Sequence, residues 1–203
     1  MRKNIIFKAA LIFAIFLVSA TTYANTKTWT IDASHTKIQF SVAHMMISSV
    51  TGDFKIFEGQ AISKGDDFTD CEVEFSADVN SIDTDDEKRD GHLKSPDFLN
   101  AKEYPKITFK SKSFKKIADN IYKVTGDFTI RDVTKSKEFD VIYGGTITDP
   151  WGNERSGFKL TGRINRFDYN LKWNKLLETG GLMVGKTVTI TCNVELIRKK
   201  DKP

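Results

Sequence analysis

The chain has 203 residues and a mass of 23.0 kDa; 39% of the residues are hydrophobic and 29% are charged. This composition fits one globular domain and excludes a collagen-like chain, a polytopic membrane protein and an extended disordered chain. The formal net charge is +4, and removing the three basic residues among the first 24, a segment without acidic residues, leaves +1. So small a charge gives no bulk electrostatic reason to bind nucleic acid or an acidic membrane, and no nucleic-acid partner is expected.

Residues 1–24 are typical of a secretory signal peptide. A basic start with Arg2 and Lys3 precedes an unbroken apolar run over residues 9–18. That run is shorter than the roughly 20 residues that span a bilayer. Small residues allow cleavage after Ala20 or after Ala24. We therefore expect a mature domain over residues 25–203, located in a periplasm or secreted.

From residue 25 onward, apolar and polar residues alternate with a period of two, which indicates half-buried β-strands. The alternation predicts strands over residues 38–44, 71–79, 107–111, 122–131, 139–143, 158–164 and 188–196. Residues 51–62 are interpreted as a further strand, bulged around Gly52 and Gly59. The total is about eight strands.

Two connections interrupt or join this pattern. Residues 84–101 carry helix signals, with Thr84 as the expected N-cap and Glu87 three residues later. Such a crossover is expected to cover one end of a barrel or sandwich. Asp149 to Gly152 has the residue preferences of a type I turn between antiparallel strands.

Strands with one apolar and one polar face form either a sandwich or a closed barrel. Closure removes both sheet edges, and an eight-stranded barrel is either filled by side chains or holds one small ligand. Cys71 and Cys192 lie on the apolar side of their strands, as buried free thiols do. We expect them to be unlinked, although an exported chain leaves a disulfide open.

The sequence contains no catalytic signature, P-loop or dinucleotide-binding motif. Its three histidines are far apart and lack ligand spacing, so no metal or cofactor is expected. The charged residues 83–94 allow two interpretations. They form a solvated helix with pairs four residues apart, or Arg89 and His92 point from one helix face to the barrel mouth and meet a polar ligand group.

Several long motifs of this chain resemble the YceI-like family, over about Trp29 to Ile197. They are IDASHTKIQFSVAHMMISSVTGDF (31–54), SIDTDDEKRDGHLKSPDFLNAKEYPKITF (81–109), GDFTIRDVTK (126–135), DPWGNERSGF (149–158) and INRFDYNLKWN (164–174). One departure is Asp132, where glycine is common in the family.

The resemblance implies an all-β fold: a closed, eight-stranded, antiparallel, lipocalin-like barrel with a short helical segment over one end. It also implies a long apolar tunnel for a polyprenyl, quinone-like or fatty-acid-derived tail. By strand parity, we expect the tunnel to be lined by Phe40, Val42, Phe54, Phe75, Ala77, Phe109, Phe128, Tyr143, Leu160, Ile190 and Val194. Candidates for contact with a polar head group are His35, His44, Arg89, Asp90, His92 and Arg131.

Three functions follow from this interpretation. The first is a non-enzymatic lipid-binding protein that sequesters or transports its ligand, in transient contact with a membrane or a membrane protein for exchange. The second is an enzyme that acts on such a lipid, with His44 or His92 and a carboxylate as acid and base. The third is a filled barrel whose outer surface binds a protein partner. The sequence leaves open the head group, the tail length and whether the protein is a homodimer.

Overall fold

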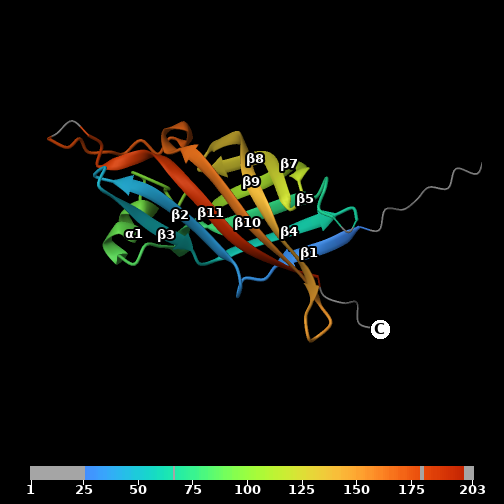
Figure 1. Ribbon diagram of the computed structural model, residues 1–203. Coiled ribbons are helices and arrows are strands. Elements are labelled where there is room, and N and C mark those ends of the chain that lie inside the picture. The colour runs from blue at the N-terminus through green and yellow to red at the C-terminus, as the bar shows by residue number, and fades with distance from the viewer. Residues whose placement is uncertain (1–25, 66, 179–180, 199–203) are drawn as a thin grey trace, which may run out of the picture.

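The computed structural model describes residues 26–65, 67–178 and 181–198, so the predicted signal peptide lies outside the described residues. The described chain forms one twisted antiparallel sheet with a single α-helix at one end (Figure 1). The strands are β1 (Lys27–Ile31), β2 (Lys37–His44), β3 (Ser48–Phe54), β4 (Phe57–Ser63), β5 (Glu72–Asp78), β6 (Ile82–Asp83), β7 (Lys106–Ala118), β8 (Ile121–Ile130), β9 (Val133–Thr148), β10 (Glu154–Asn165) and β11 (Val184–Arg198). The helices are α1 (Glu87–Lys94) and the 3₁₀ turns η1 (Val79–Ser81) and η2 (Arg166–Tyr169). None of these helices is long and apolar enough to span a bilayer.

The sheet closes into the predicted eight-stranded barrel. Strands β1 and β2 together act as one strand of the barrel, a first path interrupted at residues 32–36. Both pair with β11, which contacts β2 between Val184 and Asn193 and β1 at Leu196 and Ile197. Strands β3 and β4 form a second such path, because β3 pairs with β2 and β4 pairs with β1. Together with β5, β7, β8, β9, β10 and β11, these two paths form the eight strands of the barrel. The pairing of β1 with β11 closes the sheet.

The bulge predicted within residues 51–62 is wrong, because the register of β3 and β4 runs without a shift and the path breaks at residues 55–56 instead. The two glycines serve close packing. A Cβ on Gly52 would fall 2.5 Å from the ring of Phe40, and one on Gly59 would fall 2.7 Å from Ile31. Real Cβ atoms do not approach so closely, so a larger residue at either position would have to displace these neighbours.

Helix α1 begins later than the sequence indicated. Its N-cap is Asp86, whose side chain accepts hydrogen bonds from the amides of Lys88 and Arg89, each at 3.0 Å. Thr84 is therefore not the cap. Its hydroxyl and amide instead bind the buried carboxylate of Asp90, at 2.5 and 3.0 Å. The turn predicted at Asp149 is confirmed, since the Gly152 amide donates to its carbonyl between β9 and β10.

The two ends of the barrel differ. The helix end carries α1, the β2–β3 turn and the β10–β11 connection, whereas the closed end carries the β1–β2 loop, the β7–β8 turn and the β9–β10 turn (Figure 1). Aromatic rings fill the interior toward the closed end, where Phe68 packs on Trp29, Tyr143 and Phe158 with centroid distances of 5.4, 5.6 and 4.7 Å.

Candidate functional site

The half of the barrel nearer the helix end encloses an apolar cavity of about 220 Å³. For comparison, a cavity of roughly 150 Å³ lined by aliphatic and aromatic side chains stays dry and binds benzene. Ligand sites in proteins are likewise mostly apolar with few polar groups. The cavity therefore suits an apolar ligand group better than water.

Ten of the eleven residues expected to line a tunnel lie on the wall of this cavity. They are Phe40, Val42, Phe54, Phe75, Ala77, Phe109, Phe128, Leu160, Ile190 and Val194. Their strand parity faces them inward because successive side chains of a strand point to opposite faces. Leu93 of α1, with Phe98 and Leu99 after it, completes the wall on the side of the helix. That these residues contact a ligand stays a prediction.

Tyr143 is the exception, since it lies in the aromatic cluster rather than on the cavity wall. Its ring packs against Phe158 at 5.2 Å, and its hydroxyl shares a hydrogen bond of 2.6 Å with Thr146. Its inward parity was correct. Strand parity identifies the face of a residue but not its depth along the barrel axis.

The helix end of the cavity is covered by α1 and the segment after η2. His92, Phe98 and Trp173 contact one another there, with centroid distances of 4.9 to 5.2 Å. Nε2 of His92 also lies 3.1 Å from the Asp97 carboxylate. His92 thus forms part of this cover and does not line the cavity, and its contact with a head group stays a prediction.

Two of the other predicted head-group residues lie away from the cavity wall. His35 is in the β1–β2 loop at the closed end, where it is 59% exposed and its Nδ1 lies 3.0 Å from Asp32. His44 ends β2 and pairs with Ser48 and Val184. The structure brings neither histidine together with α1. His35 lies on the same path of β1 and β2 as the lining residues Phe40 and Val42. Its place in that strand did not reveal that it lies at the closed end, whereas the cavity is nearer the helix end.

Arg89, Asp90 and Arg131 are engaged with nearby protein groups. Arg89 donates to the hydroxyl and carbonyl of Thr84, at 2.7 and 2.5 Å. Asp90 accepts from that same threonine. Arg89 forms an ion pair with Asp86, three residues before it, and not with the residue four before it as expected. Arg131 donates to the carbonyl of Phe98 at 3.0 Å and lies over the ring of Tyr104. None of the three lines the cavity, and their contact with a ligand stays a prediction.

Arg166 is a wall residue that sequence reasoning missed. The side chain is 2% exposed, and burial lowers its pKa. It donates to the carbonyls of Trp173, Val184 and Gly185, at 2.8, 3.1 and 2.8 Å, and also to that of Leu171. Its partners in the described chain are thus carbonyls rather than carboxylates, so it fastens the β10–β11 connection while leaving a positive charge at the wall.

A signal for Arg166 was present in the sequence. It follows Ile164 by two residues, and continuing the alternation of β10 places it on the inward face. Because arginine is rarely buried, the inward face of β10 was not expected to continue to Arg166.

Cys192 lines the cavity, and Cys71 is buried in the core near the closed end; both are free thiols, as predicted. Burial raises the pKa of each to about 12. A nucleophilic cysteine needs a lowered pKa, so neither thiol suits that chemistry.

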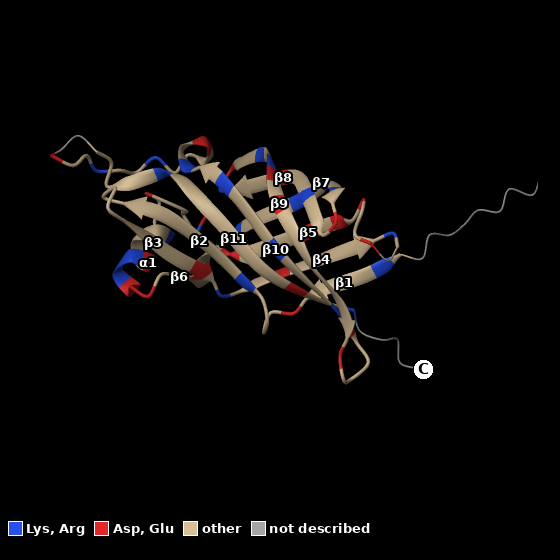
Figure 2. Cartoon of the chain, in the orientation of Figure 1, with Lys and Arg blue, Asp and Glu red and all other residues tan. Residues whose placement is uncertain are grey.

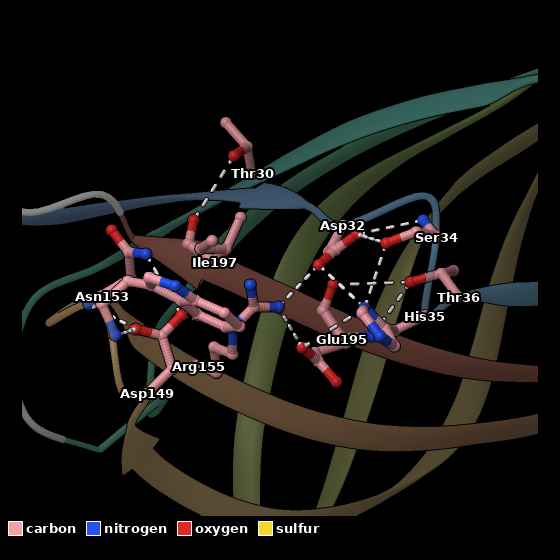
Figure 3. A network of polar contacts seen from close by, with 11 residues as sticks. Thr30, Asp32, Ser34, His35, Thr36, Asp149, Asn153, Arg155, Glu195 and Ile197 are labelled. Carbon is pink, nitrogen blue, oxygen red and sulfur yellow. Dashed lines mark hydrogen bonds and ion pairs between the residues drawn. The ribbon is translucent and has the colours of Figure 1, made fainter.

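The most extensive charged network lies at the closed end and is centred on Arg155 (Figure 3). Its Nη1 lies 2.6 Å from Asp32 and 2.5 Å from Glu195, and its Nε lies 2.8 Å from Asp149. The network joins the β1–β2 loop, the β9–β10 turn and β11. Asp32, His35 and Glu195 have the geometry of metal ligands, but the guanidinium already provides the positive charge between the two carboxylates.

The network also shifts the pKa values of its members. Burial of Asp149 opposes ionisation, but hydrogen bonds from Arg155 and Asn153 outweigh it and lower the pKa to about 2. The Ser34 hydroxyl and then Arg155 hold the pKa of Asp32 well below its usual range. This arrangement stabilises the closed end and faces away from the cavity.

Comparison with known proteins agrees with the barrel fold. A sequence profile described as the YceI-like domain matches residues 29–196. The chain belongs to the YceI-like family. This YceI-like protein is 38% identical over 168 residues to a UPF0312 protein of Staphylococcus aureus strain N315, and the match covers 82% of the chain and 95% of that relative.

Solved structures share the fold of this YceI-like protein. A YCEI protein of Campylobacter jejuni is 28% identical with a TM-score of 0.65, over 78% of this chain and 90% of the other. BcnA of Burkholderia cenocepacia has a TM-score of 0.71 at 22% identity, over 81% and 98%. A domain from Saccharophagus degradans, described as polyisoprenoid binding, has a TM-score of 0.61 at 15% identity, over 84% and 98%.

Proposed function

We propose that this YceI-like protein is an exported, non-enzymatic lipid-binding protein. It holds the tail of a long-chain isoprenoid, a quinone-like lipid or a fatty-acid derivative, for sequestration or transport. The observation that carries this proposal is the apolar cavity of about 220 Å³ inside the barrel. A polyisoprenoid-binding domain with the same fold supports it.

The expected orientation of the lipid follows from the wall. Arg166 is the charged side chain of that wall, on the side of the β10–β11 connection, while the aromatic cluster closes the opposite side. A polar head group is therefore proposed at the helix end, where Arg166, His92 and Arg131 lie, with the tail directed toward Phe109 and Cys192.

Tail burial supplies enough free energy for such a carrier. Each buried methylene contributes about 0.8 kcal/mol, so about ten carbons contribute on the order of 8 kcal/mol. Lost rotational freedom and association offset several kcal/mol of that sum. The balance favours long tails over short ones and leaves the head group to select among ligands of equal length.

The wall also explains why we prefer binding to catalysis. Among the described residues, neither histidine nor a carboxylate side chain lines the cavity. His44 and His92, the acid–base candidates, lie outside the wall, and the thiol of Cys192 stays protonated because burial raises its pKa to about 12. Enzymes that act on a bound tail need such groups within hydrogen-bond reach of it.

Export and partners complete the proposal. The basic and apolar segment over residues 1–24 supports export of the mature protein to a periplasm or out of the cell. Transport requires exchange of lipid with a membrane or a membrane protein.

A titration with fatty acids of increasing length tests the function. We expect affinity to rise about fourfold per methylene, the equivalent of about 0.8 kcal/mol, until the cavity is full. Loss of tryptophan or tyrosine fluorescence on binding, or calorimetry, reports the affinity. Affinity independent of tail length, or absence of binding at every length, would contradict the proposal.

A further inference from the structure

The helix end presents an exposed apolar tip, formed by Met46 and Ile47 of the β2–β3 turn and Leu176 of the β10–β11 connection. These side chains are 75%, 86% and 72% exposed. The two segments meet there, since the amide of Met45 donates to the carbonyl of Met183 at 2.8 Å. In soluble proteins such a gathering of large exposed apolar side chains marks an interaction site.

The backbone of the turn strengthens this argument. Met45 and Met46 both have positive φ, 51° and 64°, and the Ile47 amide donates to the carbonyl of His44. These two central positions of the hairpin turn favour asparagine and glycine. Methionine at both positions makes the turn less favourable than asparagine and glycine would. The two methionines instead place apolar side chains in contact with solvent.

Exposed basic residues flank the apolar tip. Between residues 170 and 186 the exposed charged side chains in the described chain are Lys172, Lys175, Lys186 and Glu178, a net charge of +2. Lys175 is tied to the tip, since its carbonyl accepts from the Met183 amide at 2.9 Å. In Figure 2 blue segments lie beside the tan loops at this end of the barrel.

The same segments reach the cavity wall. Val42 precedes the β2–β3 turn, while Leu171 and Val184 flank the connection, and all three line the cavity. The apolar tip and part of the cavity wall are therefore built from the same two segments.

We propose that the apolar tip and its lysines dock onto the surface of a bilayer that contains anionic lipids. Met46, Ile47 and Leu176 insert at the level of the head groups, while Lys172, Lys175 and Lys186 contact lipid phosphates. Apolar side chains beside basic residues are the usual composition of such interfacial contacts. The inference rests on the proposed function only in assigning a purpose to docking, namely lipid exchange.

Flotation of the mature protein with vesicles tests the proposal. We expect binding to phosphatidylcholine vesicles that contain phosphatidylglycerol, much weaker binding to phosphatidylcholine alone, and weakening at high ionic strength. Replacing Lys172, Lys175 and Lys186 by glutamine should weaken binding about fivefold for each lysine, or about a hundredfold together. Equal binding to both vesicle types would overturn the proposed charge contribution.

The variant Met45→Asn with Met46→Gly separates docking from folding. It introduces the pair that the turn prefers, so the melting temperature should not fall, while vesicle affinity should drop at least about tenfold. The matched control replaces Ile147 and Trp151, which are 67% and 79% exposed at the closed end, by serine. This control should bind vesicles as the parent does.

The outcomes distinguish docking from lipid binding. If the control loses vesicle binding while the turn variant retains it, the closed end docks and the proposal is overturned. If no vesicle binds the parent while fatty acids still bind with length dependence, docking alone fails. If vesicles bind but fatty acids do not, docking stands and the proposed function fails.

Discussion

Filling the cavity at Ala77 should shorten the tail that the protein accepts. Ala77 is 1% exposed, lies on β5 and faces the cavity, where its strand neighbours are Phe57 and Ile107. Phenylalanine adds about six carbons there, and displacing about as many tail carbons would cost roughly 5 kcal/mol. Repacking of the wall around added volume typically costs about 1–3 kcal/mol, so it is the cheaper response.

The expected weakening follows from the smaller cost. For the longest tails, Ala77→Phe should raise Kd about 5-fold to about 150-fold. Tails that do not contact Ala77 should bind unchanged. In the ligand-free protein the new ring occupies space that was empty, so the melting temperature should rise or stay level, as cavity-filling substitutions do.

The assay is the fatty-acid titration on the parent, on Ala77→Phe and on Ser76→Phe as a matched control. Ser76 is the preceding residue on the outer face, where its hydroxyl donates to Glu58 at 3.0 Å. The control should bind all lengths as the parent does. Equal loss in both variants, or unchanged binding of long tails by Ala77→Phe, would refute the register of β5 on which the reasoning depends.

Three further predictions concern the thiols, the charged network and export. A bound lipid should protect Cys192 from alkylation, while Cys71 serves as an internal control and denaturation exposes both thiols; mass spectrometry of labelled peptides decides this. Arg155→Gln should lower the melting temperature at neutral pH. Asp149 has a folded pKa of about 2 against 3.8 for the free side chain, so the network stabilises above pH 4, and the gap between variant and parent should narrow as pH falls from 4 toward 2. A gap independent of pH would contradict the network. Protein recovered from its own compartment should lack residues 1–20, and a peptide from that range would exclude export by cleavage.

Much of the fold was predictable because period-two alternation depends on local sequence alone. It correctly faced Phe75 and Ala77 of β5 inward. Alternation alone left a sandwich or a barrel open, and the closed barrel was implied by the resemblance to the YceI-like family. It could not place Tyr143 along the barrel axis, since depth depends on which side chains fill the closed end. Nor could it identify Phe68, which enters that cluster from a loop rather than from a strand.

The polar part of the site was less predictable because long side chains form hydrogen bonds with groups outside their own helix or strand. Arg89 and Asp90 both bind Thr84, a contact set by the fold of the segment before α1. Arg166 binds carbonyls up to 19 residues ahead in the chain. Only the three-dimensional path of the β10–β11 connection brings those carbonyls to it.

Native mass spectrometry of the protein purified from its own compartment, without detergent, tests the central claim most directly. We expect a complex with one intact lipid, whose tail mass identifies an isoprenoid or acyl chain after extraction into organic solvent. Protein that carries no lipid, and takes none from an extract of its own membranes, would contradict a carrier, and a bound lipid converted to a new mass during incubation would assign an enzyme instead.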